Sequence, residues 1–217
     1  KKAKVRQWLK HGAIQVNGRS TTRFNYLLRP GDVVTIRDKS EVLALGVLPF
    51  GMQVLFEDAA LIVIEKPAGL LSMASETERE RTAYAYLTEY IRHGKPRSEA
   101  RVWIVHRLDR GTSGVILIAK TREIQEALSS QFKKREIKKE YEAIAWGKMW
   151  LEGRVATPIG RDKKNRQKMS SHSDHTRSAL TLWKVETPFK HFSHVALFPH
   201  TGRTHQLRVH LSESGHS

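Results

Sequence analysis

Short apolar runs and stripes of apolar residues at helical spacing follow one another along the 217 residues of this chain. Residues 54–58 and 61–66 predict two strands around a short acidic turn, and the apolar run 115–118 predicts a strand buried on both faces. Helical spacing of apolar residues predicts helices over residues 79–92 and 122–135. Strands interrupted by helices, without regular alternation of the two, indicate an α+β fold.

The first residues of the chain predict a separate small module. A helix whose apolar face carries Val5, Trp8 and Leu9 ends at Gly12, and strands follow over residues 14–16 and 33–36. Turns are predicted at Asn17-Gly18 and at Arg29-Pro30-Gly31-Asp32.

The charge of the chain favours a polyanionic partner. The sequence has 38 Lys and Arg against 22 Asp and Glu, a net charge of +16 and a pI near 10.2. Nucleic acid is the expected partner, because no stretch combines a cationic face with the wide apolar face that a membrane surface requires. The sequence contains no secretory signal pattern and no Cys, which excludes disulfides and Cys-ligated zinc. We therefore expect an intracellular protein, in a bacterial cytoplasm or a eukaryotic organelle.

One acidic residue stands in a loop that precedes a predicted strand. The sequence His106-Arg107-Leu108-Asp109-Arg110-Gly111-Thr112-Ser113-Gly114 combines turn-forming residues with a single carboxylate, and the apolar run 115–118 follows it directly. Asp109 is thereby placed at the rim of a sheet. Taken alone, the same pattern also suits an Asp that only caps its own turn.

This loop closely resembles the active-site motif of the RluA-type RNA pseudouridine synthases. Three further segments resemble motifs of that family in the required order: Lys66-Pro67-Ala68-Gly69, residues 138–147 and residues 201–211. The segment 138–147 predicts a strand closed by a glycine. Four ordered matches across most of the chain identify it as a member of the family, although fold and activity are separate claims.

The resemblance implies that the protein isomerises specific uridines in structured RNA to pseudouridine. The reaction breaks the bond from ribose to nitrogen 1 of the base and forms one to carbon 5, so no cofactor and no metal are expected. It implies Asp109 as the catalytic carboxylate, acting on the sugar as nucleophile or as base, Tyr141 as the group that takes the proton from carbon 5, and Arg208 as the cation that pairs with the carboxylate. If residues 206–211 form a strand, Arg208 lies on the face opposite Leu207 and Val209.

Other basic and polar residues are expected to contact RNA. Arg107 resembles the family position whose side chain fills the gap left by the extruded base, a role that a planar cation suits. The remaining expected substrate contacts are Lys66, His106, Arg110, Thr112 and Arg203. Contacts to the RNA backbone are expected from Lys4, Arg6 and Lys10 in the first helix and from Lys163, Lys164, Arg166 and Lys168 in a basic loop. For the basic helix and for the basic loop, the alternative is an ordinary solvated surface.

Two other functions remain open at this point. A metal-dependent hydrolase is suggested by His200, His205 and His210, but on a strand the last two would face opposite sides and no carboxylate cluster completes a site. An RNA-binding or ribosome-assembly protein of the same fold without catalysis fits the charge equally well. The presence of Asp109, Tyr141 and Arg208 together favours the enzyme.

The expected architecture follows from the resemblance. It implies a mixed, largely antiparallel central sheet with flanking helices over residues 46–217, and residues 1–45 resemble the small RNA-binding module named after the fourth small-subunit ribosomal protein. Residues 38–50 are the expected linker. The resemblance also implies that both ends are incomplete, because the chain begins inside the module's helical region and stops at Gly215-His216-Ser217. We expect a monomer acting on ribosomal RNA, with transfer RNA as the other candidate substrate.

Overall fold

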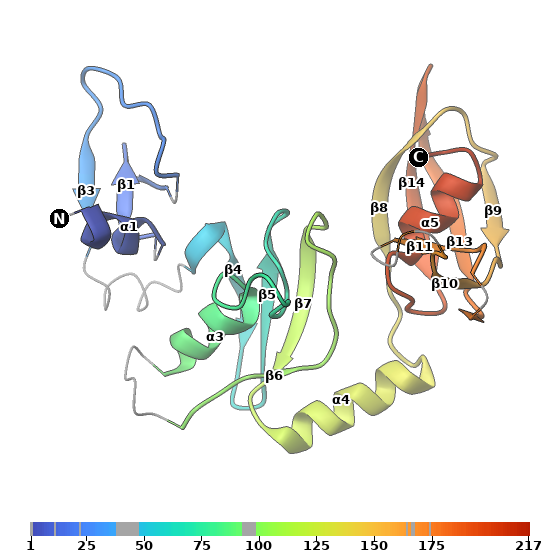
Figure 1. Ribbon diagram of the computed structural model, residues 1–217, viewed down its shortest axis with the longest axis horizontal. Coiled ribbons are helices and arrows are strands. Elements are labelled where there is room, and N and C mark those ends of the chain that lie inside the picture. Colours follow the sequence, from blue (N-terminus) through green and yellow to red (C-terminus); the bar gives the residue numbers. More distant parts are fainter. Residues whose placement is uncertain are drawn as a thin grey trace. The chain divides into compact units, whose positions relative to one another are not determined.

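A computed structural model forms two compact units, Lys1–Ser130 and Gln131–Ser217, and each is described by itself (Figure 1). It describes residues 2–10, 12–21, 23–37, 48–92, 99–163, 165, 168–173 and 175–217, without the side chains of Ala3, Gln7 and Lys10. The predicted linker 38–50 lies mostly outside the described residues.

The N-terminal part of the first unit has the predicted helix and turns. Its elements are α1 (Lys2–Lys10), β1 (Ile14–Val16), β2 (Arg19–Ser20) and β3 (Val34–Ile36), with antiparallel strands in the order β2-β1-β3. The turn after β1 needs a left-handed backbone, which Asn17 (φ 50°) and Gly18 (φ 77°) supply. The second predicted turn is closed by Asp32, whose carboxylate accepts from the Arg29 backbone N–H and from the Asn17 amide. These hydrogen bonds lower the pKa of Asp32.

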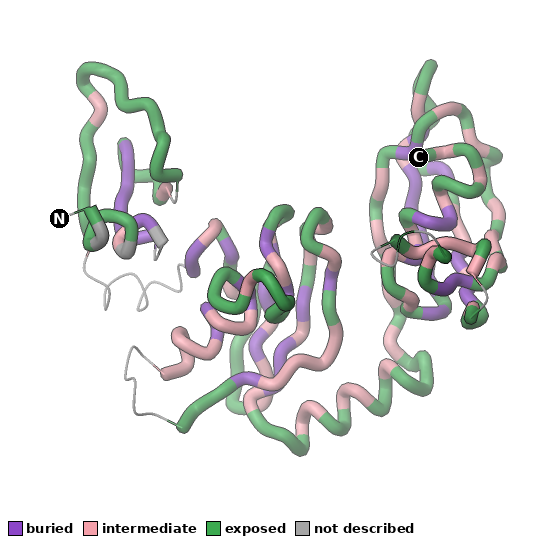
Figure 2. Tube along the Cα trace, viewed as in Figure 1, coloured by how far each residue is buried: buried purple, intermediate pink, exposed green. Residues whose placement is uncertain are grey.

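A four-stranded antiparallel sheet follows in the first unit, in the order β4-β5-β7-β6. This part of the unit consists of a 3₁₀ turn (Pro49–Gly51), β4 (Gln53–Glu57), β5 (Leu61–Lys66), α3 (Ala83–Ile91), β6 (Trp103–Ile104) and β7 (Gly114–Ala119). Ile62 and Ile64 pair with Ile118 and Ile116, and all four residues are fully buried. Figure 2 shows buried positions along the strands that Figure 1 labels β5 and β7. The prediction that this last strand is buried on both faces is wrong, because Val115 is 54% exposed. Burial alternates along β7, so one face of the strand carries the core.

Helix α3 is shorter than predicted because Thr82 caps it. The Thr82 hydroxyl accepts a hydrogen bond from the Ala85 backbone N–H (3.1 Å), which fixes the first turn. The helix buries Ala83, Tyr86 and Leu87. The Tyr86 hydroxyl is buried and has no hydrogen-bond partner among the described residues.

Replacing Tyr86 with phenylalanine is expected to stabilise the protein by about 1 kcal/mol, because it removes a buried hydroxyl without a partner. Burial also raises the pKa of Tyr86 from 10.0 to about 12. The unfolded chain therefore releases this proton first, so that the stability of the parent falls as the pH rises from 10 towards 12. In urea titrations the variant should be about 1 kcal/mol more stable than the parent at pH 7, and it should lack this fall in stability above pH 10.

Tyr90→Phe is the matched control, because the Tyr90 hydroxyl donates to the Glu57 carboxylate at 2.8 Å. This variant should be no more stable than the parent at pH 7. Equal destabilisation by both substitutions would contradict the assignment of Tyr86 as unpaired.

The predicted helix after the Asp109 loop is α4 (Arg122–Lys134). The Thr121 hydroxyl accepts from the Ile124 N–H (3.3 Å), and Lys133 and Lys134 occupy the last turn. The apolar residues whose spacing predicts this helix are half-buried, except Ala127, which is exposed.

The second unit contains a second four-stranded antiparallel sheet, in the order β8-β14-β13-β9. Its core is built from Ala145, Val185, Val195 and Leu197. A small three-stranded sheet, in the order β11-β10-β12, contributes Ile159 to a neighbouring cluster. The elements are β8 (Tyr141–Trp146), β9 (Glu152–Val155), β10 (Ile159–Arg161), β11 (Met169–Ser170), β12 (Thr176–Arg177), β13 (Thr181–Pro188), β14 (Phe192–Pro199) and α5 (Gln206–Glu213).

Residues 206–211 form part of helix α5, so the predicted strand at this position is wrong. Its buried residues are Gln206, Val209 and His210, at the spacing of one helical face. The alternation Leu207, Val209, Leu211 imitated a strand. His205 and His210 therefore do not lie on opposite faces of a strand, as the sequence had indicated.

The α+β class is confirmed. All strand pairs of the described sheets are antiparallel, and one isolated parallel bridge joins Leu71 to Thr82. Within the described residues, no helix has the length and apolar character needed to cross a membrane.

Candidate active site

The Asp109 loop connects β6 to β7 in the first unit. Asp109 is half-buried, between buried Leu108 and exposed Arg110. The Thr112 N–H donates to the Asp109 carbonyl oxygen (3.1 Å), which closes the turn, and Gly114 adopts φ 131° where β7 begins. Arg107 is exposed, as insertion into RNA requires.

Lys66 lies fully buried at the end of β5, where it pairs with Gly114. Its ammonium group donates to the carbonyl oxygens of Pro67 (2.9 Å), Leu70 (2.8 Å) and Arg110 (3.5 Å). Burial lowers the pKa of Lys66, and the charge of Asp109 acts in the opposite direction.

This environment corrects the expectation that Lys66 contacts substrate. Its protons are directed to backbone carbonyls, and its side chain has no exposed surface. The ammonium instead connects the turn after β5 to the Asp109 loop.

A backbone hydrogen bond makes the same connection. The Gly69 N–H donates to the Arg110 carbonyl oxygen at 2.7 Å. Gly69 adopts φ 87°, a conformation that a side chain would strain. The Lys-Pro-x-Gly motif is thus the support on which the loop of Asp109 rests.

His106 anchors the other end of the loop. The Leu117 backbone N–H donates to its Nε2 atom at 3.0 Å. Because that nitrogen accepts, the proton of the neutral ring resides on Nδ1. The half-buried ring of His106 therefore supports the loop structurally, and its contact with substrate stays a prediction.

Tyr141 and α5 lie together in the second unit. Tyr141 begins β8, pairs with Leu197 of β14 and packs on the core cluster that Leu207 of α5 also covers. Burial alternates cleanly along β8, so Tyr141 faces the same side as Ala143 and Ala145. Lys139 adds a contact to the loop before α5, donating to the Thr201 carbonyl oxygen (3.2 Å). Burial lowers the pKa of Lys139.

A buried polar network fixes the start of α5. The side-chain oxygen of Gln206 accepts from Thr201 Oγ1 (2.7 Å) and from the Arg203 N–H (3.0 Å). Its amide nitrogen donates to Thr181 Oγ1 (3.0 Å) and to the Leu180 carbonyl oxygen (3.1 Å). The sequence did not lead us to predict a role for Gln206, although a polar Gln beside apolar helical positions is a signal for such a network.

His210 extends the network one turn further along α5. Its Nε2 atom donates to the Thr157 carbonyl oxygen (2.9 Å), and its Nδ1 atom lies 2.9 Å from Thr181 Oγ1. Both ring nitrogens are thus occupied by structural contacts. Among the residues described, no group of three His, Asp or Glu side chains could hold a metal ion.

Arg203 and Arg208, the two arginines expected at the site from residues 201–211, differ in their surroundings. Arg208 is exposed on α5. Arg203 is half-buried, and its Nε atom donates to the Ser178 carbonyl oxygen at 3.0 Å. Arg110 is exposed and Thr112 half-buried. Asp109 belongs to the first unit, whereas Tyr141 and Arg208 belong to the second.

The expected RNA-backbone residues that the structure describes are exposed. These are Lys4 and Arg6 on α1 and Lys163 and Lys168 in the loop between β10 and β11. The loop is tightened by Asp162, whose carboxylate accepts from the Asn165 N–H (2.8 Å). The side chain of Lys10, together with Lys164 and Arg166, lies outside the described residues.

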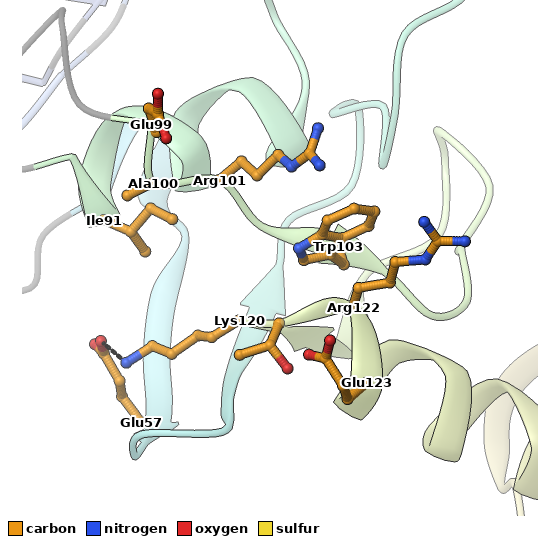
Figure 3. Close-up of a pocket in the computed structure, with 10 residues that line it drawn as sticks. Glu57, Ile91, Glu99, Ala100, Arg101, Trp103, Lys120, Arg122 and Glu123 are labelled. Atoms are coloured by element: carbon orange, nitrogen blue, oxygen red, sulfur yellow. Dashed lines mark ion pairs between the residues drawn. The ribbon is translucent and has the colours of Figure 1, made fainter.

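A cavity of about 550 Å³ lies at the opposite end of the first sheet (Figure 3). Trp103, which lines it, pairs with Ala119 at the end of β7, whereas the Asp109 loop precedes the start of that strand. Lys120 in the cavity forms an ion pair with Glu57 (2.6 Å), drawn as a dashed line in Figure 3. None of the expected site residues lines this cavity.

Residues 60–213 match the RNA pseudouridylate synthase family, and residues 1–34 match the S4 domain. The chain belongs to the RNA pseudouridylate synthase family. Among its pseudouridine synthase relatives is the ribosomal large subunit pseudouridine synthase D of Neisseria meningitidis serogroup B, 34% identical over 99% of this chain and 57% of the relative. The uncharacterized RNA pseudouridine synthase YhcT of Bacillus subtilis is 38% identical over 98% of this chain and 70% of its own length. The chain therefore spans little more than half of the Neisseria relative.

Solved structures of pseudouridylate synthase domains share the fold. Human RNA pseudouridylate synthase domain containing 4 is 28% identical, with a TM-score of 0.60 over 81% of this chain and 66% of that chain. Human RNA pseudouridylate synthase domain containing 1 is 25% identical, with a TM-score of 0.62 over 76% of this chain and 66% of that chain.

Proposed function

We propose that this protein isomerises specific uridines in RNA to pseudouridine, with Asp109 as the catalytic carboxylate. The observation that carries the proposal is the fixed placement of that carboxylate. Asp109 is half-buried in a loop that is held at two points. Lys66 and Gly69 both donate to the Arg110 carbonyl oxygen of this loop, and the Leu117 N–H of β7 donates to His106. A carboxylate held in this way suits attack on, or proton removal from, a ribose that the enzyme has oriented.

Tyr141 and Arg208 complete the proposed chemistry. In the isomerisation the bond from carbon 1′ to nitrogen 1 breaks, the base turns, and carbon 1′ bonds to carbon 5. The Tyr141 hydroxyl takes up the proton that carbon 5 releases as it passes its own proton on, and nitrogen 1 gains a proton, so the product has the same composition as uridine. Arg208, which is exposed on α5, is the cation that the family resemblance assigns to pairing with the catalytic carboxylate.

The substrate proposed is ribosomal RNA in a bacterial cytoplasm. Support comes from the S4 match at residues 1–34, from exposed Lys4 and Arg6 on α1, and from the name of the Neisseria relative, a ribosomal large subunit pseudouridine synthase. A net charge of +16 favours tight, salt-dependent binding to RNA phosphates. We propose that the protein acts as a monomer.

Tritium release tests the proposal. Transcripts of large-subunit ribosomal RNA and of transfer RNA, labelled with tritium at carbon 5 of uridine, are incubated with the protein. We expect release from ribosomal RNA and none from the same RNA labelled at carbon 5 of cytidine. Tight binding to both RNAs without release from either would instead favour an RNA-binding protein that lacks catalysis.

A further inference from the structure

We propose that Ser72 is a positioning residue that fixes the direction of Asp109 through the backbone of Leu108. The Ser72 hydroxyl donates to the Leu108 carbonyl oxygen at 2.7 Å and accepts from the Leu108 N–H at 3.1 Å. One side chain thus satisfies both polar backbone groups of the residue directly before the proposed catalytic carboxylate. This inference rests on the proposed function.

The surroundings make these two hydrogen bonds hard to replace. Ser72 is 3% exposed and Leu108 is 6% exposed, so solvent is largely kept from them. Leu108 lies in a loop, outside the strands, and has no ladder to pair its backbone groups. Without the hydroxyl, a buried N–H and a buried C=O would lose their partner.

Ser72 is itself held by the start of α3. The Tyr84 N–H donates to the Ser72 carbonyl oxygen (3.1 Å), and the Ala83 N–H donates to the Leu71 carbonyl oxygen (2.8 Å). Thr82, fully buried, caps the same helix. The serine is therefore attached to a rigid element and transmits its position to the loop.

Residues on both sides of Asp109 are thereby fixed by one short segment. Ser72 holds Leu108, and Gly69 holds Arg110 through its N–H at 2.7 Å. Asp109 is left between two anchored neighbours, so that its backbone can rotate little. Loss of one anchor should alter the direction of the carboxylate while leaving the RNA-binding surface in place.

The test compares Ser72→Ala with Ser193→Ala. Ser193 is the matched control, because it is fully buried and its hydroxyl also bridges two backbone groups, donating to Gly147 O (3.0 Å) and accepting from Met149 N (3.2 Å). It lies in the second unit, whereas the Asp109 loop belongs to the first. Single-turnover tritium release is measured at 25 °C over a range of enzyme concentrations, with thermal unfolding of each protein recorded in parallel.

We expect Ser72→Ala to lower the rate constant at saturating enzyme by about tenfold or more, because misplacement of a reacting group affects the chemical step. The enzyme concentration that gives half of the maximal rate should stay within about twofold of that of the parent. Ser193→Ala should lose comparable thermal stability and keep its rate constant within about twofold. If Ser72→Ala does not fold, Ser72→Cys, which retains a weaker donor and acceptor, takes its place with the same expected separation of rate and binding.

A rate constant for the Ser72 variant equal to that of the parent or of Ser193→Ala would overturn the inference and leave the proposed function intact. So would a loss confined to the half-saturating concentration. Absence of tritium release from the parent itself would overturn the proposed function and this inference with it.

Discussion

Replacing Asp109 with asparagine is expected to lower tritium release more than about a thousandfold, because the neutral amide can act neither as a nucleophile nor as a base. The side chains have nearly the same shape, and the hydrogen bonds that hold the loop at Leu108 and Arg110 stay in place. The variant should therefore fold and bind RNA as the parent does. Single-turnover release and a filter-binding titration measure the two properties separately.

Asp58→Asn is the control for that experiment. The Asp58 carboxylate accepts from the Ala60 and Leu61 N–H groups (2.7 and 2.8 Å) in the turn between β4 and β5, and these hydrogen bonds lower its pKa. Its substitution changes the charge by the same amount at a position outside the proposed site, and release should stay within about twofold of the parent. Retention of substantial activity by Asp109→Asn would remove Asp109 from its proposed role.

Replacing Lys66 with methionine is expected to destabilise the first unit by about 2–4 kcal/mol. Methionine fills a similar volume, but the carbonyl oxygens of half-buried Pro67 and of buried Leu70 lose their donor. The Asp109 loop also loses its contact through Arg110 O, so activity should fall in molecules that remain folded. Urea unfolding gives the stability, and single-turnover release at low temperature gives the activity of the folded fraction.

Lys184→Met provides the comparison for Lys66. Lys184 donates to Glu186 at 3.2 Å, but its side chain is 62% exposed. Removal of an exposed ion pair should cost less than about 1 kcal/mol and leave release unchanged. If the two lysine substitutions had equal effects on stability, the buried ammonium would not be the support described for the loop.

The first sheet and the Asp109 loop were predictable from the sequence because their signals are local. Turn residues flank the acidic residue, and β5 and β7 are short apolar runs, so that these two strands and the loop were placed correctly. What the sequence could not give was the environment of Lys66. Its burial depends on carbonyl groups of residues 67, 70 and 110, and a basic side chain in a basic protein carries no local sign of them.

The second unit was harder to predict for a different reason. Leu207, Val209 and Leu211 alternate as in a strand, and only the distant partners of Gln206 and His210 make a helix with a polar buried face favourable. Tyr141 lies on a regular strand whose alternation was hidden by Ile144 and Trp146. Both are apolar yet 64% and 66% exposed on the opposite face. The chemical roles of Asp109, Tyr141 and Arg208 remain predictions from the family.

The Ser72–Leu108 contact joins residues 36 apart in the sequence, and Lys66 reaches Arg110 across 44. Such contacts close long loops and cannot persist once β5 and β7 separate, because no local structure replaces them. A partly folded chain would keep its positive charge and its attraction for RNA but would lack an oriented carboxylate. The direction of the Asp109 carboxylate therefore depends on the pairing of these two strands, whereas attraction to a polyanion depends only on the charge of the chain.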